Sequence, residues 1–372
     1  MFNDPDAPDL LMRPREARLH YFRNKTIEHP RLLACYGHAL RYVNQPPRDT
    51  ILVVIGPTGV GKTTFIKKLQ DHVVAQAQEA MLVDPGFVPF LNIEASAPEF
   101  GTFDWKEFYT RILVAFRDPF VCDDQGRPYY RPGMVTRNLR TAVESALKHR
   151  HPVAVCVDEA QHIAKMASNK RLTDNMDVVK SLRSLATRPL ILCGTYDLGL
   201  LMDLSGQICR RCIEVPFAPY SADEKDDIEA FVSTLYTFQN CVPLSGDTDL
   251  VSHYDLLFEG SLGCVGILKV WLDQALGRTL EEDRATITLD DLRSTRIEMR
   301  KLAKMAKEID EEEKRLAGEA GDRDAVRRAV GLSTDGEHSG HHSIQEKAGR
   351  GTARPGQRHP MRDPVGPYTG RP

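Results

Sequence analysis

The chain has 372 residues, of which 41% are hydrophobic and 27% are charged. This length and composition allow a sizeable core and two or three domains, and they exclude a mini-protein, a collagen and a wholly disordered chain. The 49 lysine and arginine residues face 52 aspartate and glutamate residues, so the net charge is −3. This balance excludes a uniformly basic protein of the histone type.

No apolar run approaches the roughly 20 residues that a membrane helix needs. The longest such runs cover residues 51–55 and 153–157. Residues 1–6 lack the basic and apolar regions of a signal peptide. We therefore expect a cytoplasmic protein that makes no membrane contact. The eight cysteines fit reduced thiols, and the single CxxC pair has no second pair to complete a zinc site.

Residues 51–217 show short apolar strands that alternate with amphipathic helices. We expect strands at 51–55, 89–95, 153–158, 190–194 and 212–216. Runs that are apolar throughout are typical of a parallel sheet covered on both faces. Apolar residues at helical spacing follow the first strand and precede the third. Alternation of this kind predicts an α/β domain.

The rest of the chain divides by composition. Residues 1–48 are expected to form an N-terminal helical lead-in, followed by the α/β core at 49–218 and a small helical domain at 219–300. Residues 301–332 are highly charged and predict an extended, solvated helix. Residues 333–372 hold few large apolar side chains, which cannot offset the entropy of ordering, so we expect a disordered tail.

A phosphate-binding loop follows the first predicted strand. Residues 56–63 fit G-x-x-x-x-G-K-[ST] (Walker A) at every fixed position, and a predicted helix follows. Glycines let successive N–H groups point at the phosphates, and the helix N-terminus adds favourable partial charge. The motif predicts an ATP site rather than a plain glycine-rich turn. Its expected contacts are Gly56, Pro57, Thr58, Gly59, Val60, Gly61, Lys62 (on the β- and γ-phosphates), Thr63 (on magnesium) and Thr64.

Two acids, Asp158 and Glu159, end the third predicted strand. The carboxyl ends of parallel strands share one sheet edge, so both carboxylates are expected beside the P-loop. Asp158 would hold Mg²⁺, directly or through water, and Glu159 would orient or deprotonate the attacking water in transfer of the γ-phosphoryl group (Walker B). The alternative for an Asp-Glu pair at this position is an ordinary helix cap.

Three more candidates follow from their place in the strand order. Thr195 ends the fourth strand, so its hydroxyl either holds the attacking water or belongs to a plain strand end. Arg210 and Arg211 precede the fifth strand, far from the chain's own P-loop. They are either arginine fingers that reach into a neighbouring subunit's ATP or a solvated surface pair.

This order of motifs resembles the AAA+ ATPases, and within them the TniB/TnsC group of transposition regulators. The narrower resemblance rests on the segments 28–32, 91–98, 158–162 (Asp-Glu-Ala-Gln-His), 192–195 and 260–268, which together span residues 25–295. The resemblance implies an α/β fold of the AAA+ P-loop NTPase type. That fold is a parallel five-stranded αβα sandwich followed by a small helical lid domain, here with the disordered tail at its C-terminus.

The resemblance also implies a function. Proteins of this group bind ATP, assemble as rings or helical filaments on target DNA, and recruit or activate the transposase; hydrolysis disassembles them. Some work with a CRISPR effector and an adaptor that select the target. Many AAA+ lids carry an arginine that touches the γ-phosphate, but residues 263–269 contain none. Lys269 therefore substitutes for that arginine, or the contact is absent.

Charge is distributed unevenly along the chain. Residues 111–140 carry a net +3, residues 163–189 a net +4 and residues 219–260 a net −8. The two basic segments flank the third strand, and stacked subunits would repeat them around a channel. Basic side chains there could contact DNA phosphates without sequence preference, or simply be solvated. The candidates for contact with double-stranded DNA are Arg127, Arg131, Arg137, Lys170 and Arg171.

Two rival classes remain beside a transposition regulator. The first is an AAA+ replication initiator or helicase loader, which usually adds an ordered DNA-reading domain after the lid. The second is a secretion or signalling ATPase that remodels a protein partner, which tends to carry a membrane span or a repeat array. Neither addition is recognisable in this sequence.

Overall fold

The computed structural model describes residues 10–98, 102–123, 125–129, 134–164, 175, 178–179, 188–201, 210–316 and 325–331. The chain divides into two units, Met1–Leu316 and Ala317–Pro372. In the second unit, residues 325–329 are helical. The predicted disordered tail, residues 333–372, lies outside the described residues. None of the described helices is both long and apolar enough to span a membrane.

Five parallel strands form one sheet in the order β2-β3-β4-β1-β5. They are β1 (Ile51–Ile55), β2 (Phe90–Glu94), β3 (Ala154–Asp158), β4 (Leu190–Gly194) and β5 (Cys212–Pro216). Strands β1, β3 and β4 are buried at every position, as expected for central strands with both faces covered. The predicted fold class is confirmed.

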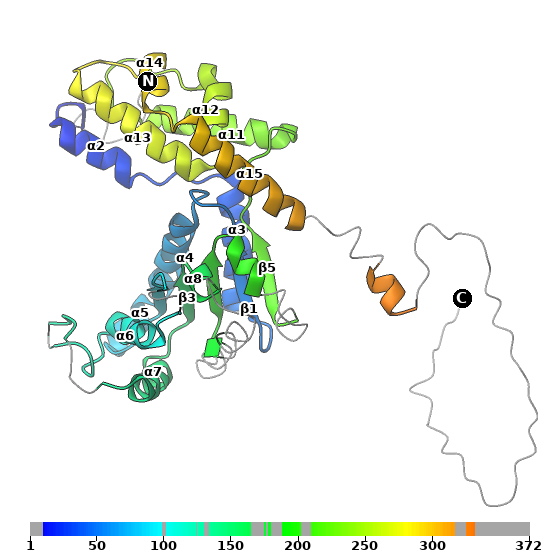
Figure 1. Cartoon of the computed structure of the whole chain (residues 1–372). Coiled ribbons are helices and arrows are strands. Elements are labelled where there is room, and N and C mark those ends of the chain that lie inside the picture. Colours follow the sequence, from blue (N-terminus) through cyan, green and yellow to red (C-terminus); the bar gives the residue numbers. More distant parts are fainter. Residues whose placement is uncertain are drawn as a thin grey trace, which may run out of the picture. The chain divides into compact units, whose positions relative to one another are not determined.

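Helices cover both faces of the sheet (Figure 1). Side chains alternate along a strand, so Ile51, Val53 and Ile55 enter one core while Leu52 and Val54 enter the other. The first core is closed by α6 (Trp105–Ala115) and α7 (Thr136–Arg150), and the second by α3 (Pro30–Asn44) and α4 (Lys62–Gln76). The short elements are α5 (Gln78–Val83), α8 (Gln161–Ala164) and η1 (Tyr196–Leu201).

A helical lid follows the sheet and has a core of its own. It consists of α11 (Lys225–Cys241), η2 (Val251–His253), α12 (Tyr254–Ser261), α13 (Val265–Glu281) and α14 (Leu289–Thr295). Helix α2 (Arg15–Asn24) joins this core through Phe22, and Arg23 forms an ion pair with Asp273 of α13 at 3.0 Å. The expected lead-in at 1–48 is therefore split, because α2 packs on the lid whereas α3 packs on the sheet.

Helix α15 (Met299–Leu316) differs from the extended, solvated helix expected over 301–332. Its described span packs on the sheet, where Ile309 and Leu316 contact the first core and Leu302 is buried. These apolar residues recur at helical spacing among the charges, so one stripe of the helix is buried. The opposite side carries ion pairs such as Lys307–Glu311.

His29 lies where the sheet meets the lid. Its ring stacks on Phe217 just after β5, with ring centroids 6.2 Å apart, and its Nδ1 shares a hydrogen bond of 3.1 Å with the hydroxyl of Tyr220. Burial lowers the pKa of His29 to about 4, because the imidazolium form would lose its hydration. The junction therefore holds a neutral histidine at physiological pH.

This burial predicts a pH-dependent stability. His29 takes up a proton near pH 6.5 in the unfolded chain, whereas in the folded chain it stays neutral down to about pH 4. The free energy of unfolding therefore falls as the pH drops below 6.5. The loss attributable to His29 reaches about 3 kcal/mol at pH 4. Urea unfolding between pH 7 and 4.5 should show a shallower pH slope in His29→Gln. The exposed His149→Gln should keep the wild-type slope, and equal slopes in all three proteins would contradict the prediction.

Candidate nucleotide site

The loop between β1 and α4 has the backbone conformation that its glycines permit. Gly59 and Gly61 have φ values of +81° and +118°, which residues with a Cβ rarely adopt. A Cβ at Gly56 would overlap the carbonyl oxygen of Phe217. Within the described part of the chain, the N–H groups of Gly59 and Gly61 have no hydrogen-bond acceptor. The loop thus presents backbone donors, which fit a phosphate group.

Lys62, the first residue of α4, is a buried cation inside this loop. The residue is 7% exposed, and its ammonium donates to the carbonyl oxygens of Gly56 and Pro57, each at 2.9 Å. Burial lowers the pKa of Lys62, and the carboxylates of Glu159 and Asp158 oppose that effect. A buried ammonium within a loop of free N–H groups makes this a site for an anion.

Asp158, the last residue of β3, and Glu159, which follows it, lie beside the loop. Asp158 Oδ2 accepts a hydrogen bond of 3.4 Å from the hydroxyl of Thr63, and Asp158 Oδ1 accepts one of 2.8 Å from the Glu159 N–H. Burial raises the pKa of Asp158, since the ionised carboxylate is poorly solvated there. Two hard oxygen ligands, the Asp158 carboxylate and the Thr63 hydroxyl, are the kind that Mg²⁺ prefers.

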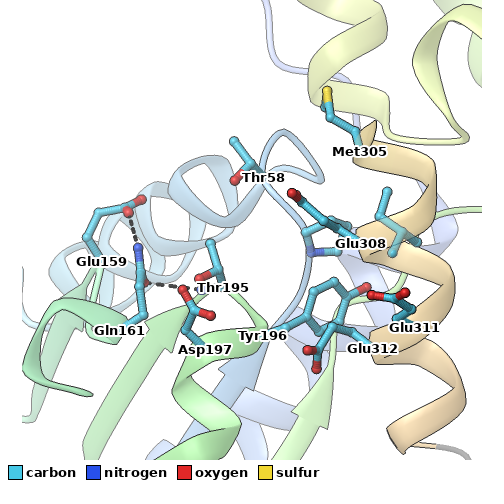
Figure 2. A pocket seen from close by; sticks show the side chains of 12 residues that line it. Thr58, Glu159, Gln161, Thr195, Tyr196, Asp197, Met305, Glu308, Glu311 and Glu312 are labelled. Carbon is cyan, nitrogen blue, oxygen red and sulfur yellow. Dashed lines mark hydrogen bonds between the residues drawn. The ribbon is translucent and has the colours of Figure 1, made fainter. Parts of the chain in front are cut away.

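A cavity of about 560 Å³ opens next to these groups (Figure 2). The sheet side contributes Thr58 from the P-loop, Glu159 after β3 and Thr195 after β4. The structure therefore brings Thr195 and Glu159 to one cavity. The opposite wall comes from α15 and consists of Met305, Glu308, Ile309, Glu311 and Glu312.

Helix α15 is attached at the end of β4. The Tyr196 hydroxyl donates to Glu313 Oε1 at 2.5 Å, and Arg315 donates to the carbonyl oxygen of Tyr196 at 3.3 Å. Burial and the neighbouring Glu313 raise the pKa of Tyr196. The helix that carries the acidic wall of the cavity is thus hydrogen-bonded to the residue that follows Thr195.

A second cavity, of about 130 Å³, lies on the other side of the P-loop. The loop contributes Val60, Gly61 and Thr64, and the lid contributes Val265, Gly266 and Lys269. The linker between α2 and α3 supplies the remaining side, including Ile27 and His29. The lining mixes apolar side chains such as Val60 and Val265 with polar ones such as Thr64 and Lys269, a combination that fits a planar ligand with polar edges, such as a nucleobase.

The lid touches the P-loop through its backbone. The Ile267 N–H, in the first turn of α13, donates to the carbonyl oxygen of Gly59 at 3.1 Å. A Cβ at Gly266 would overlap that same carbonyl oxygen. The missing side chain at position 266 is what lets the lid helix approach the loop.

Lys269 lines the smaller cavity, and its ammonium is held by hydrogen bonds within the chain. Its ammonium donates to the carbonyl oxygens of Phe22 and Lys25, the latter at 3.1 Å, and lies 3.9 Å from the centre of the Phe22 ring. Burial lowers its pKa to about 8. Lys269 thus lines the smaller cavity, but its partners belong to the α2 end of the chain, an arrangement that does not favour contact with a γ-phosphate.

The arginines before β5 lie away from this site within the chain. Arg210 and Arg211 precede the first residue of β5, and the carbonyl oxygen of Arg211 accepts from the N–H of Ile51, where β1 begins. The P-loop follows the opposite end of β1. The two arginines and the P-loop therefore stand at opposite edges of one parallel sheet.

The DNA candidates are partly described. Arg127 is exposed and pairs with Asp123 at 2.9 Å, and Arg137 is exposed in the first turn of α7. Arg131, Lys170 and Arg171 lie outside the described residues. The two described arginines are not part of the cavities around the P-loop.

Sequence reasoning missed three contributors to the site: Ile27 and His29 in the smaller cavity, and the acidic side chains of α15. The segment 28–32 contributed to the family resemblance, but its place against the lid is a long-range contact that no local pattern encodes. The glutamates of α15 resembled those of any solvated helix. A search for its buried apolar stripe would have indicated that α15 packs on another element.

The arrangement of sheet, P-loop and lid is the AAA+ P-loop NTPase fold. Residues 47–202 match the profile of the AAA domain family, so this part of the chain is an AAA-type P-loop ATPase domain. No curated protein is significantly similar to the chain in sequence.

Several solved structures are similar to the chain. The ORC1 protein of Aeropyrum pernix, solved in complex with DNA, has a TM-score of 0.51 at 14% identity, over 76% of this chain and 68% of that one. The ORC2 protein of the same organism has a TM-score of 0.48 at 16% identity, over 76% and 73%. Domain III of the Thermotoga maritima replication initiation protein DnaA has a TM-score of 0.46 at 12% identity, over 78% and 96%. At 14% identity the likeness to ORC1 shows the fold alone.

Because the lid and the P-loop are in close contact at Gly266, one added methyl group there should disturb nucleotide binding. Gly266→Ala places a Cβ against the Gly59 carbonyl, so the lid must move away and both cavities must change shape. We expect weaker binding of a fluorescent ATP analogue, by about tenfold or more. Gly277→Ala on the same helix has nothing within 4 Å of the added Cβ and should leave binding unchanged. Equal affinity of the two variants would contradict the prediction.

Proposed function

We propose that the chain binds ATP with Mg²⁺ and hydrolyses it to ADP and phosphate. One observation carries this proposal: Lys62, Thr63, Asp158, Glu159 and Thr195 lie together at one edge of the sheet, around a loop of free backbone donors. The AAA domain match over residues 47–202 supports it.

Each of these residues has a role that its position allows. Lys62 and the N–H groups of the P-loop bind the phosphates. Thr63 and Asp158 would hold Mg²⁺, which neutralises charge on the phosphate oxygens. Glu159 orients or deprotonates the attacking water, and Thr195 offers its hydroxyl to the same water. The smaller cavity, with Val60, Ile27 and Val265 as walls, receives the base.

We further propose that the protein assembles on DNA and regulates transposition. The resemblance to the TniB/TnsC group supports this role, as do the two basic segments and the position of Arg210 and Arg211. At the edge opposite the P-loop, these arginines are free to reach the ATP of a second copy in a ring or filament. In this proposal ATP-bound copies line double-stranded DNA and recruit the transposase, and hydrolysis releases them.

A second candidate is a replication initiator or helicase loader of the AAA+ class. The observation that favours it is the fold shared with Aeropyrum pernix ORC1, a protein solved in complex with DNA. The two candidates differ in partner. A cognate integrase-type transposase stimulated by the ATP-bound protein would support the transposition role, whereas loading of a replicative helicase would support the second.

The proposed role of Glu159 predicts that its substitution lowers turnover without weakening ATP binding. Glu159→Gln keeps the shape and hydrogen bonds of the side chain but lacks the carboxylate, so kcat should fall by about 10²-fold or more while ATP affinity persists. Phosphate release and binding of a fluorescent ATP analogue measure the two effects. Glu79→Gln, an exposed change on α5, is the matched control. Normal turnover in Glu159→Gln would remove Glu159 from this role.

The DNA role predicts filaments or rings on long duplex DNA with saturating ATP and Mg²⁺, visible by negative-stain microscopy. Glu159→Gln should accumulate such assemblies, because release requires hydrolysis. Arg137→Ala should weaken binding uniformly across sequences and reduce the slope of log affinity against log salt by about one. Arg293→Ala, an exposed change in the lid, should not. A wild-type protein that stays monomeric on DNA would contradict the proposed assembly.

A further inference from the structure

Gln161 is a buried amide that connects the Glu159 carboxylate to the end of β4. The residue is 4% exposed and is the first of α8, two positions after Glu159. The amide nitrogen donates to Glu159 Oε2 at 2.5 Å, and the amide oxygen accepts from the Thr195 N–H at 3.1 Å. In Figure 2, Gln161 lies between Glu159 and Thr195 at the edge of the larger cavity.

The contact with Thr195 determines which way the amide points. A backbone N–H can only donate, so its partner must be the amide oxygen. The NH₂ end is then left facing Glu159, where it can only donate to the carboxylate. The hydrogen-bond network thus defines the orientation of Gln161 without ambiguity.

The surroundings leave this amide little freedom. A Cβ at Gly194 would lie 2.6 Å from the Gln161 amide oxygen, so the glycine at the end of β4 makes room for it. The backbone on either side of Glu159 is also held, since the Glu159 N–H donates to Asp158 Oδ1 and the Ala160 N–H donates to the carbonyl oxygen of Cys193, both at 2.8 Å. What remains variable at Glu159 is its side-chain torsions, and Gln161 restrains those.

We propose that Gln161 is a positioning residue, which fixes the Glu159 carboxylate relative to Thr195. The proposal rests on the ATP hydrolysis proposed above. Glu159 and Thr195 are the two groups expected to contact the attacking water, and Gln161 hydrogen-bonds to both residues. One side chain thereby ties the Glu159 carboxylate to the backbone of Thr195, and a displacement of about 1 Å in such a pair costs about 10²-fold in rate.

Two substitutions test the hydrogen bonds separately from the volume. Gln161→Met has a similar length and neither hydrogen-bonding end, and Gln161→Glu keeps an oxygen for Thr195 but turns an acceptor toward Glu159. Both should lower kcat for ATP by about 10²-fold, while KM and the affinity for a fluorescent ATP analogue stay within about twofold, because Gln161 makes no hydrogen bond to the P-loop. Gln78→Glu, the same change at an exposed site on α5, should keep the wild-type kcat.

A reversed pair separates positioning from structure. Gln161→Glu combined with Glu159→Gln re-forms the hydrogen bond with donor and acceptor exchanged. The double variant should recover the melting temperature that Gln161→Glu loses, but its hydrolysis should remain absent, because the carboxylate now stands at position 161. Recovery of stability together with hydrolysis would overturn the proposal.

The remaining outcomes are equally decisive. Wild-type kcat in Gln161→Met would overturn the positioning role, and so would a parallel loss of kcat, affinity and melting temperature, which indicates a structural role alone. Absence of hydrolysis by the wild-type protein would overturn the proposed function and this proposal with it. Failure of Gln161 alone, beside an active wild type, would leave the proposed function standing.

Discussion

The parallel order of the five strands is the constraint on which the site depends. Because β1, β3 and β4 are neighbours and run in one direction, their carboxyl ends meet, and the P-loop, the Asp158–Glu159 pair and Thr195 follow those ends. An antiparallel partner would send one of these groups to the opposite edge, some 15 Å away for a five-residue strand. Arg210 and Arg211 precede β5 at that opposite edge, so the same strand order places them away from the P-loop of their own chain.

The site concentrates charge where hydration is poor. Lys62 is buried beside Asp158, and burial disfavours the charged form of both. Each offsets part of the other's cost, as does the hydrogen bond from the Glu159 N–H to Asp158. Among the described residues that line the larger cavity, none is lysine or arginine, whereas five are acidic. The positive charge that would stabilise an anion in this cavity therefore comes from the P-loop side, from Lys62 and the N-terminus of α4.

The sheet and the P-loop could be predicted because their signals are local. Five apolar runs and one eight-residue motif carry the information in consecutive residues, and the predicted ends of β1, β4 and β5 match the observed ones. The partners of α2 and α15 could not be predicted in this way. Phe22 meets the lid across more than 200 residues of sequence, and Glu313 meets Tyr196 across 117. The hydrogen bonds of Lys269 could not be predicted either, since its carbonyl partners at Phe22 in α2 and at Lys25 just after it have no counterpart in any motif.

The attachment of α15 beside Thr195 also bears on how the lid can move. The lid is held to the ATPase domain by the backbone bond between Ile267 and Gly59, and α15, which follows the lid in the chain, is held again at Tyr196. A further contact joins the two sides, the ion pair of Arg31 in α3 with Asp227 in α11 at 2.5 Å. Because only residues 296–298 separate α14 from α15, a displacement of the lid is passed along the chain to α15 and so to Tyr196 at the end of β4.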